Sequence, residues 1–383
     1  MAPLELARLT DELDARLERA DAELVRCYPG GTGVPQPVHT VYVPADRFDA
    51  STAVSYGEQA LATLAEHEDL FLELIGDDRR LLERVRWRLR TRPVDDLRID
   101  FEDGYGTRPD DAEDAAVGAA ATALRTAIAA GTAPPSYGIR FKSLERPTRH
   151  RGLRTLAGFV DALTGGGPLP AGFVVTLPKV TSVDQVEAMV HAAGHLETGL
   201  ALEPGSLRFE IQVETPQSIL GTDGTALVAR MIHAADGRCT GLHYGTYDYS
   251  AYVGIAAAHQ ALDHPAADHA KAVMQAAAAG TGVRLSDGST NILPIGDADA
   301  VRLGWETHLR LVRRSLERGF YQGWDLHPAQ LPTRYAATFA FYRAGRPAGS
   351  RLEEPATDRA LADFLRRGRA CGAFDDADDT GEG

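Results

Sequence analysis

The sequence predicts an α/β protein built on a (β/α)8 TIM barrel, with extra N-terminal and C-terminal helices. Short runs rich in β-branched and aromatic residues alternate with longer helical patterns over most of the chain. Eight such runs can be counted, which is the strand number of this barrel. A doubly wound open sheet is the alternative, but no G-x-G-x-x-G motif follows any of the predicted strands.

The 383 residues divide into three predicted parts. The first holds an N-terminal helical segment and a Pro/Gly-rich linker, and the second is the barrel. The third holds a C-terminal helix, at about 358–369, and an acidic tail that we expect to be disordered. We expect the N-terminal segment, one helix or a broken pair over Leu4 to about Arg26, to dock outside the main core. The three parts are residues 1–37, 38–345 and 346–383.

The predicted strands are short, and the fourth is nearly all apolar, as a strand buried on both faces should be. They are residues 38–43, 97–101, 137–142, 172–179, 208–213, 240–245, 283–285 and 321–326. The predicted helices lie between them. They are residues 45 to about 90 in several pieces, then 112–130, 155–163, 183–193, 224–234, 265–279, 298–317 and 331–344.

Composition narrows the range of partners. The apolar content of 44% and charged content of 25% are ordinary for a globular protein. A net charge of -14 without a basic block argues against nucleic acid and anionic membranes. The N-terminus lacks the apolar core of a signal peptide, and no window is long and apolar enough to span a membrane. Three widely spaced cysteines, Cys27, Cys239 and Cys371, are typical of reduced thiols, so we expect a cytoplasmic protein.

Acidic residues follow three of the predicted strands. Glu102 and Asp103 come after the second strand, Glu214 ends the fifth, and Asp248 comes after the sixth. The carboxyl ends of barrel strands meet at one face, which is where barrel enzymes place their active sites. Glu214 and Asp248 come from adjacent strands and can converge on one cation, as the carboxylates of a Mg²⁺ site do. We therefore predict a Mg²⁺ site there, with Mn²⁺ as an alternative, whereas Asp100 within its strand is more simply structural.

Basic residues occupy the same predicted face. Arg140 offers a planar fork for a substrate carboxylate, and Lys142 follows it. Lys179, after Leu-Pro, is either catalytic or a solvated lysine at the barrel rim. His327 is either a substrate ligand or a packed loop histidine. His243, His259 and the turn at 287–291 have simpler structural explanations.

Seven short motifs, in order, resemble the citrate lyase β-subunit/malyl-CoA lyase family of the HpcH/HpaI aldolase superfamily. Asp100-Phe-Glu-Asp103 is similar to the family's D-L-E-D, and Val41-Tyr-Val-Pro44 to its first strand. No single motif is specific, but their order over residues 41–330 is. The others are Ile139-Arg140, Leu177-Pro-Lys-Val180, Val213-Glu-Thr215, Tyr244-Gly-Thr-Tyr-Asp248 and Leu326-His-Pro-Ala-Gln330.

The resemblance, closest to a bacterial branch of that family, implies specific roles. Glu214 and Asp248 would bind Mg²⁺, and Arg140 would bind the substrate. Catalytic roles would fall to Arg140, Glu102, Asp103 and Lys179. The resemblance also implies a homo-oligomer, a trimer or hexamer. Substrate contacts would come from Arg140, Lys142, Thr215, Gly245 and His327.

The sequence departs from the family at the first strand, where His39-Thr40 stands for the usual Arg-Ser, and at Phe141-Lys142. The use of a CoA thioester is therefore left open. The expected activity is a Mg²⁺-dependent carbon–carbon lyase or aldolase acting on a 2-oxo or hydroxy acid through a stabilised enolate. The alternatives are a thioesterase or phosphoenolpyruvate-type enzyme on the same site, or a non-catalytic barrel that binds an oxo acid.

Overall fold

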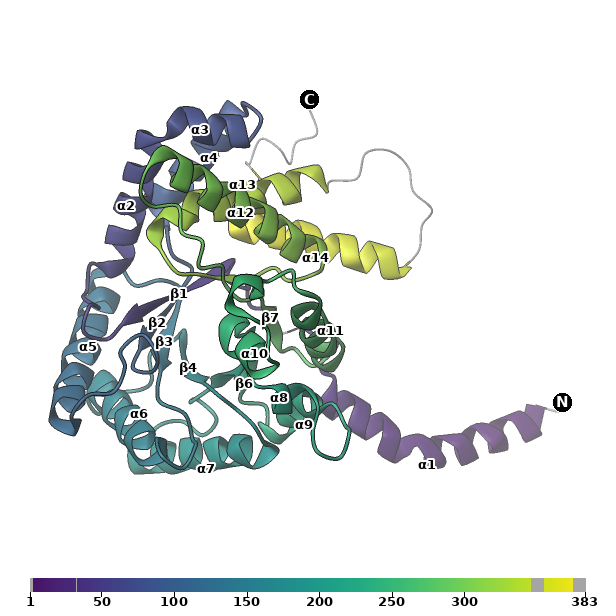
Figure 1. Ribbon diagram of the computed structural model, residues 1–383. Helices are drawn as coiled ribbons and strands as arrows, with labels where there is room; N and C mark the ends of the chain where they lie inside the picture. Colours follow the sequence, from purple (N-terminus) through teal and green to yellow (C-terminus); the bar gives the residue numbers. More distant parts are fainter. Residues whose placement is uncertain (1–2, 32, 346–354, 375–383) are drawn as a thin grey trace.

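Eight parallel strands form the centre of the computed structural model, which describes residues 3–31, 33–345 and 355–374. Each strand pairs with its sequence neighbour, and β1 also pairs with β8. The ring closes between β7 and β8, where Ser286 bridges to Gln322 and the Asp287 N–H donates to the Gln322 carbonyl at 2.8 Å. The predicted (β/α)8 barrel is therefore confirmed (Figure 1). The strands are β1 His39–Pro44, β2 Asp96–Asp100, β3 Ser136–Arg140, β4 Phe173–Leu177, β5 Phe209–Val213, β6 Cys239–Tyr244, β7 Arg284–Ser286 and β8 Gly323–Asp325.

Helices surround the barrel and extend it at both ends of the sequence (Figure 1). Those between strands are α2 Thr52–Glu66, α3 Glu68–Leu74, α4 Arg79–Thr91, α5 Asp110–Ala130, α6 Arg149–Thr164, α7 Val183–Gly199, α8 Pro216–Ile219, α9 Leu227–Ala234, α10 Thr246–Tyr252, α11 Pro265–Ala278 and α12 Ala298–Glu317. The short 3-10 turns are Ala257–His259 and Pro328–Gln330, and the outer helices are α1 Pro3–Cys27, α13 Leu331–Ala344 and α14 Pro355–Cys371.

Local sequence sets several helix ends. The Asp78 carboxylate accepts from the Leu81 N–H at 2.8 Å and begins α4, and Asp297 does the same for α12. Gly131 ends α5 in the left-handed conformation, with φ 70°, which a residue with a Cβ adopts at a cost. These caps place the strand that follows each helix.

Alternation along each strand separates an apolar outside from a polar inside. Ile99, Ile139 and Ile211 are fully buried in the core between strands and surrounding helices. On the inner face, Arg98 of β2 donates to Thr176 of β4 and Glu210 of β5. TIM barrels usually fill this interior with bulky apolar side chains, so a charged interior is a departure from the common pattern.

A second apolar core lies outside the barrel, between α2, α4, α12, α13 and α14. Trp305 of α12 is fully buried there and donates from its indole N–H to the Ala329 carbonyl at 2.8 Å. Tyr335 and Phe339 of α13 are also fully buried. This helical layer encloses α13, which explains why α13 has apolar and small residues on all sides.

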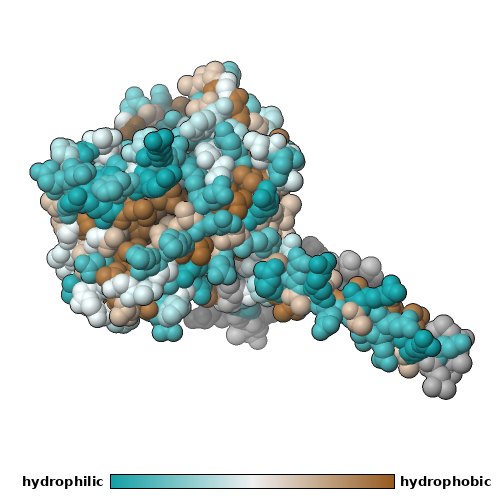
Figure 2. Space-filling model, turned by 90° about the horizontal axis from the view of Figure 1, so that it is seen from below, coloured by the Kyte–Doolittle hydropathy of each residue, from teal (hydrophilic) through white to brown (hydrophobic). Residues whose placement is uncertain are grey.

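Some boundaries differ from the sequence-based prediction. The seventh and eighth strands are only three residues long, and an extra turn of helix, α8, follows β5. The N-terminal helix is continuous from Pro3 to Cys27, and it projects from the barrel instead of docking beside it (Figures 1 and 2). The acidic tail at 375–383 lies outside the described residues. Among the residues described, no helix has the length and apolarity to span a membrane.

Candidate active site

The predicted acidic residues gather around one lysine at the carboxyl ends of the strands. The Lys179 ammonium lies 2.8 Å from Glu102 Oε1, 2.8 Å from Asp103 Oδ2 and 3.8 Å from Asp248 Oδ1. Burial alone would lower the pKa of Lys179, but Glu214 and Glu102 raise it, so the side chain stays protonated. One ammonium thus faces four carboxylates that come from β2, β5 and β6.

Lys179 has an unusual backbone conformation. Its φ of 51° lies in the left-handed region, which is uncommon for a residue with a long side chain. This geometry directs its backbone N–H to Glu214 Oε1 at 2.7 Å, while its ammonium reaches Glu102 and Asp103. Backbone strain of this kind is concentrated at functional sites.

Glu214 is the most enclosed of the four acids. Its side chain is fully buried, and its second oxygen accepts from Gln212 Nε2 at 2.7 Å. Burial raises the pKa of Glu214 to about 8; Lys179 opposes the shift, and Asp248 adds to it. A Cβ at Gly245 would lie 2.9 Å from Glu214 Oε2, so a glycine is needed there for Glu214 to keep its place. Glycine 245 therefore shapes the site through Glu214.

The two acids after β2 differ in environment. Burial raises the pKa of Glu102, although Arg140 and Lys179 oppose the shift. Asp103 is exposed, and its hydrogen bond with Lys179 lowers its pKa against the effect of desolvation. Two neighbouring carboxyls are thus pushed in opposite directions, which is common where proton transfer is catalysed.

Arg140 is held by Asp100 in a two-pronged ion pair. Arg140 Nε and Nη2 donate to the two Asp100 oxygens at 2.8 and 2.6 Å. Asp100 also accepts from the Glu102 and Gly104 N–H groups, which fixes the start of this loop. The remaining edge of the guanidinium, at Nη1, lies 3.3 Å from Glu102 and 3.4 Å from Gln212. The two-pronged side of the Arg140 guanidinium, which the sequence analysis assigned to a substrate carboxylate, therefore binds Asp100. Only its Nη1 edge faces Glu102 and the other acids of the cluster.

Three residues that the sequence analysis did not single out complete this group. Gln212 joins Arg140 to Glu214, since it accepts from one and donates to the other. The rings of Tyr42 and Trp324 lie 4.8 and 5.5 Å from the Arg140 guanidinium carbon. The period-2 alternation that marks Glu214 also puts Gln212 on the inner face, so this residue could have been found from the sequence.

The predicted substrate ligands are not all brought together. The Lys142 ammonium is buried in an ion pair with Glu113 of α5 at 2.7 Å and donates to the Phe101 carbonyl, so it joins a strand to a helix and does not reach the site. Thr215 is buried and donates to the Val180 carbonyl at 2.6 Å. His327 caps the turn that follows β8 by accepting from the Ala329 N–H, and burial lowers its pKa.

The donor set suits a hard divalent cation. In the described part of the chain, no three His, Cys, Asp or Glu side chains are already arranged as a metal cluster. Mg²⁺ usually takes only one or two protein carboxylates together with waters and substrate oxygens. Glu214 and Asp248 meet that requirement, and the surplus of carboxylates over the single ammonium of Lys179 is a charge that a cation would balance.

Comparison with solved structures finds the same fold in several proteins. A citrate lyase from Burkholderia xenovorans aligns over 90% of this chain and 94% of its own, with a TM-score of 0.60 and 17% identity. A malate synthase from Haloferax volcanii aligns over 86% and 80%, with a TM-score of 0.53 and 14% identity. The CitE protein of Mycobacterium tuberculosis, in complex with magnesium, acetoacetate and coenzyme A, aligns over 88% and 99%, with a TM-score of 0.50 and 19% identity.

The fold that the citrate lyase resemblance implied is therefore confirmed. The comparison with curated proteins gives no match. A family model described as "Domain of unknown function (DUF6986)" matches residues 17–382, which is nearly the whole chain. The chain belongs to the DUF6986 family, and it has the (β/α)8 fold of the citrate lyase and malate synthase structures.

Proposed function

We propose that this protein is a Mg²⁺-dependent carbon–carbon lyase or aldolase that acts on a small 2-oxo or hydroxy acid. The observation that carries the proposal is the buried Glu214, whose pKa is raised to about 8 beside three further carboxylates and a guanidinium. Structures with this fold include a citrate lyase, and CitE in complex with magnesium, acetoacetate and coenzyme A. Those contents agree with a metal and an acid substrate for this protein.

The roles of the residues follow from their positions. Glu214 and Asp248 would hold the metal, which supplies Lewis-acid polarisation of a substrate oxo group when bound. Glu214 would give up its proton to do so. The Nη1 edge of Arg140, which Asp100 does not use, would bind the substrate carboxylate in place of Glu102 and Gln212, while Asp100 keeps the guanidinium plane fixed. Lys179 would hold Glu102 and Asp103, with which it pairs, beside the substrate.

Whether the substrate is a CoA thioester is part of the same proposal and has to be tested separately. His39 and Thr40, the departure from the family pattern, are both fully buried inside β1. His39 accepts from the Asp95 N–H, and Thr40 donates to Asp96. Their identity therefore reports on barrel packing and does not bear on whether a CoA phosphate can bind.

The decisive experiment is a screen of 2-oxo acids, hydroxy acids and their CoA thioesters for cleavage or condensation. It should be run with Mg²⁺, with Mn²⁺ and with EDTA. We expect turnover that needs the divalent ion. Glu214→Gln and Asp248→Asn should remove both turnover and calorimetric Mg²⁺ binding, while the exposed control Glu317→Gln keeps both. Binding of an oxo acid with Mg²⁺, but no turnover of any compound, would replace the lyase by the non-catalytic binding barrel.

The implied homo-oligomer can be measured in the same preparation. A trimer or hexamer should give three or six times the 41.1 kDa chain mass by light scattering. A monomer at all concentrations would remove the oligomeric part of the proposal and leave the metal site untouched.

A further inference from the structure

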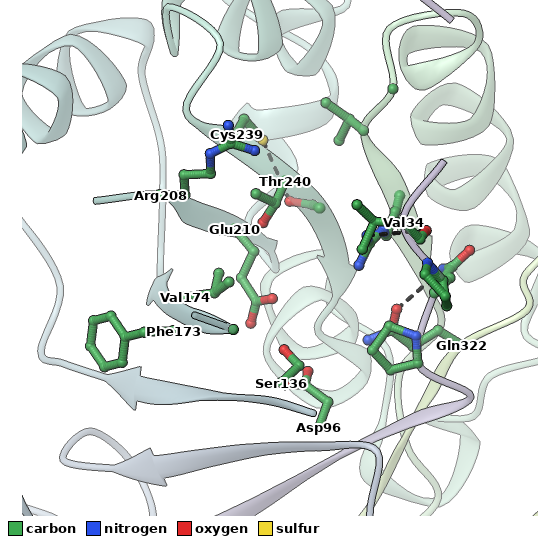
Figure 3. Close-up of a pocket in the computed structure, with 18 of the residues that line it drawn as sticks. Val34, Asp96, Ser136, Phe173, Val174, Arg208, Glu210, Cys239, Thr240 and Gln322 are labelled. Carbon is green, nitrogen blue, oxygen red and sulfur yellow. Dashed lines mark hydrogen bonds between the residues drawn. The ribbon is translucent and has the colours of Figure 1, made fainter. Parts of the chain in front are cut away.

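A large cavity lies at the opposite end of the barrel from the carboxylate cluster. Its volume is about 1020 Å³, and it is lined by residues at the amino ends of the strands, including Asp96, Ser136, Phe173, Arg208 and Arg284. Figure 3 shows side chains from several strands directed into this space. Ligand pockets for small molecules usually measure about 300–1,000 Å³, so the volume suits a metabolite.

The cavity exists because the barrel interior is not filled in the usual way. Ser136 and Gly241 stand at positions along the wall where bulky apolar residues commonly close a barrel. The linker between α1 and β1 forms part of the cover: Gly30 donates to the Gly280 carbonyl at 2.8 Å, and Gln36 to the Leu285 carbonyl at 2.9 Å. A pocket with its own cover is thereby built at the end of the barrel that most such enzymes leave packed.

The two acidic residues at the centre of the wall, Asp96 and Glu210, already pair with a cation. Arg98 is fully buried and donates to Glu210 at 2.8 and 3.0 Å and to Asp96. Glu210 also accepts from Thr176 at 2.5 Å and lies 2.9 Å from His243 Nε2. A cationic ligand would therefore find no free carboxylate at the centre of this network.

Positive groups of the wall lack a matching anion. Arg284 has no carboxylate at ion-pair distance among the described residues, and its hydrogen bond is a 3.4 Å contact with the Val34 carbonyl. Burial lowers the pKa of Arg284; Asp96 and Glu210 oppose the shift from farther away, and Arg367 adds to it. Arg208 lines the mouth without an ion pair in the part of the chain that the structure describes.

A buried nitrogen also lacks a partner. His243 is 4% exposed and lines the cavity, and its Nδ1 makes no hydrogen bond with any described residue. Nε2 of the ring lies 2.9 Å from the Glu210 carboxylate, and Nδ1 has almost no accessible surface, so this nitrogen is not open to a ligand in the cavity. The remaining wall is partly apolar, with Leu169, Phe173 and Ile232.

We propose that this cavity is a second ligand site, separate from the strand-end site, for a small organic anion whose phosphate or carboxylate pairs with Arg284. Arg208 adds positive potential at the mouth. The site stands whether or not the proposed lyase activity is correct, because it shares no residue with the carboxylate cluster.

The reactivity of the Cys27 thiol can report on ligand binding at this end of the barrel. It is a partly exposed free thiol at the cavity mouth, whereas Cys239 and Cys371 are buried and burial raises the pKa of both to about 12. The test measures the rate of Cys27 labelling by a disulfide reagent in the full-length protein with EDTA present. Glycerol 3-phosphate is the phosphate probe and glycerate the carboxylate probe.

We expect at least one probe to slow Cys27 labelling and to raise the unfolding temperature of the wild-type protein. Arg313→Gln, which changes an exposed arginine outside the cavity, is the control and should respond to the probe as the wild type does. Arg284→Gln should weaken that probe about tenfold or more, as the loss of a charged hydrogen bond does, and Arg284→Lys should weaken it less. Ser136→Phe, which places a bulky ring in the cavity wall, should weaken protection. Equal protection in wild type and Arg284→Gln, or no protection by either probe up to about 10 mM, overturns the proposal.

Discussion

Glu214 controls the charge of the carboxylate cluster because it alone is both fully buried and without a salt bridge to a basic side chain among the described residues. Its partners are a backbone N–H and the Gln212 amide, which stabilise a carboxylate less than a full positive charge does. The pKa of about 8 therefore leaves this acid mostly protonated at neutral pH when no cation is bound.

This leads to a prediction about stability and pH. The pKa of Glu214 rises from 4.5 in the unfolded chain to about 8 in the folded one. Its contribution is therefore fully present below pH 4.5 and is lost as pH rises through 8. In EDTA, Glu214→Gln should gain stability over the wild type from acid to alkaline pH, by on the order of 5 kcal/mol. Urea unfolding at several pH values measures the gap, and a gap that stays constant contradicts the assignment.

Arg140 gives a second prediction at the residue scale. Lysine keeps the charge but cannot hold Asp100 with two parallel hydrogen bonds while it presents a third N–H to the substrate. For the substrate found by the screen, Arg140→Lys should lower kcat/KM about 100-fold, or about 2.7 kcal/mol, with kcat affected as well as KM. Arg146→Lys, an exposed change in the following loop, is the control. A rise in KM with unchanged kcat would limit Arg140 to ground-state binding.

Two glycines inside helices show how the same residue type serves different elements. A Cβ on Gly118 in α5 meets nothing within 4 Å, whereas one on Gly368 in α14 would clash with the Phe374 ring and lie 3.2 Å from Tyr342. Gly118 is therefore a weak point of an exposed helix, and Gly368 lets α14 approach the second core.

The matched pair of alanine substitutions should have opposite signs. Gly118→Ala should stabilise the protein by about 0.5–1 kcal/mol because alanine loses less backbone entropy in a helix. Gly368→Ala should destabilise it by about 1–3 kcal/mol because a packed contact is forced apart. Thermal unfolding of both variants beside the wild type measures this. Stabilisation by Gly368→Ala would mean that α14 packs more loosely than the structure indicates.

At this scale the sequence predicted the barrel and the order of its elements well. Apolar alternation and helical periods are local properties, and they marked even the weak strand that begins at Arg284. The ion pair of Lys142 could not be predicted from local sequence. Its partner Glu113 lies on α5, 29 residues away, and the two meet only in the folded structure. The same holds for Arg140, whose fork is taken by Asp100 from the neighbouring strand. The position of α1, which projects from the barrel, was also not predictable, because an amphipathic pattern does not specify what its apolar face meets.

For the molecule as a whole, the barrel interior connects the two ends of the protein. The inner layer runs from Glu214 and Gln212 near one end, through Arg98 and Glu210, to the cavity at the other. Such a charged interior is not favoured by stability alone, since desolvation of buried ions offsets much of their attraction. A charged interior leaves space and polar groups for ligands at both ends of the barrel, whereas a packed apolar interior would leave neither.

The buried triad of Asp96, Arg98 and Glu210 makes this testable. Removal of one partner from a buried ion pair leaves an uncompensated charge, so Arg98→Met should destabilise the barrel by about 3–5 kcal/mol. When Asp96→Asn and Glu210→Gln are added, no charge is stranded, and most of that loss should be recovered even though more native contacts are gone. Chemical denaturation of the single and triple variants measures both values. If the triple variant is no more stable than Arg98→Met, the two carboxylates are not stranded by the loss of Arg98, and the account of the charged interior is wrong.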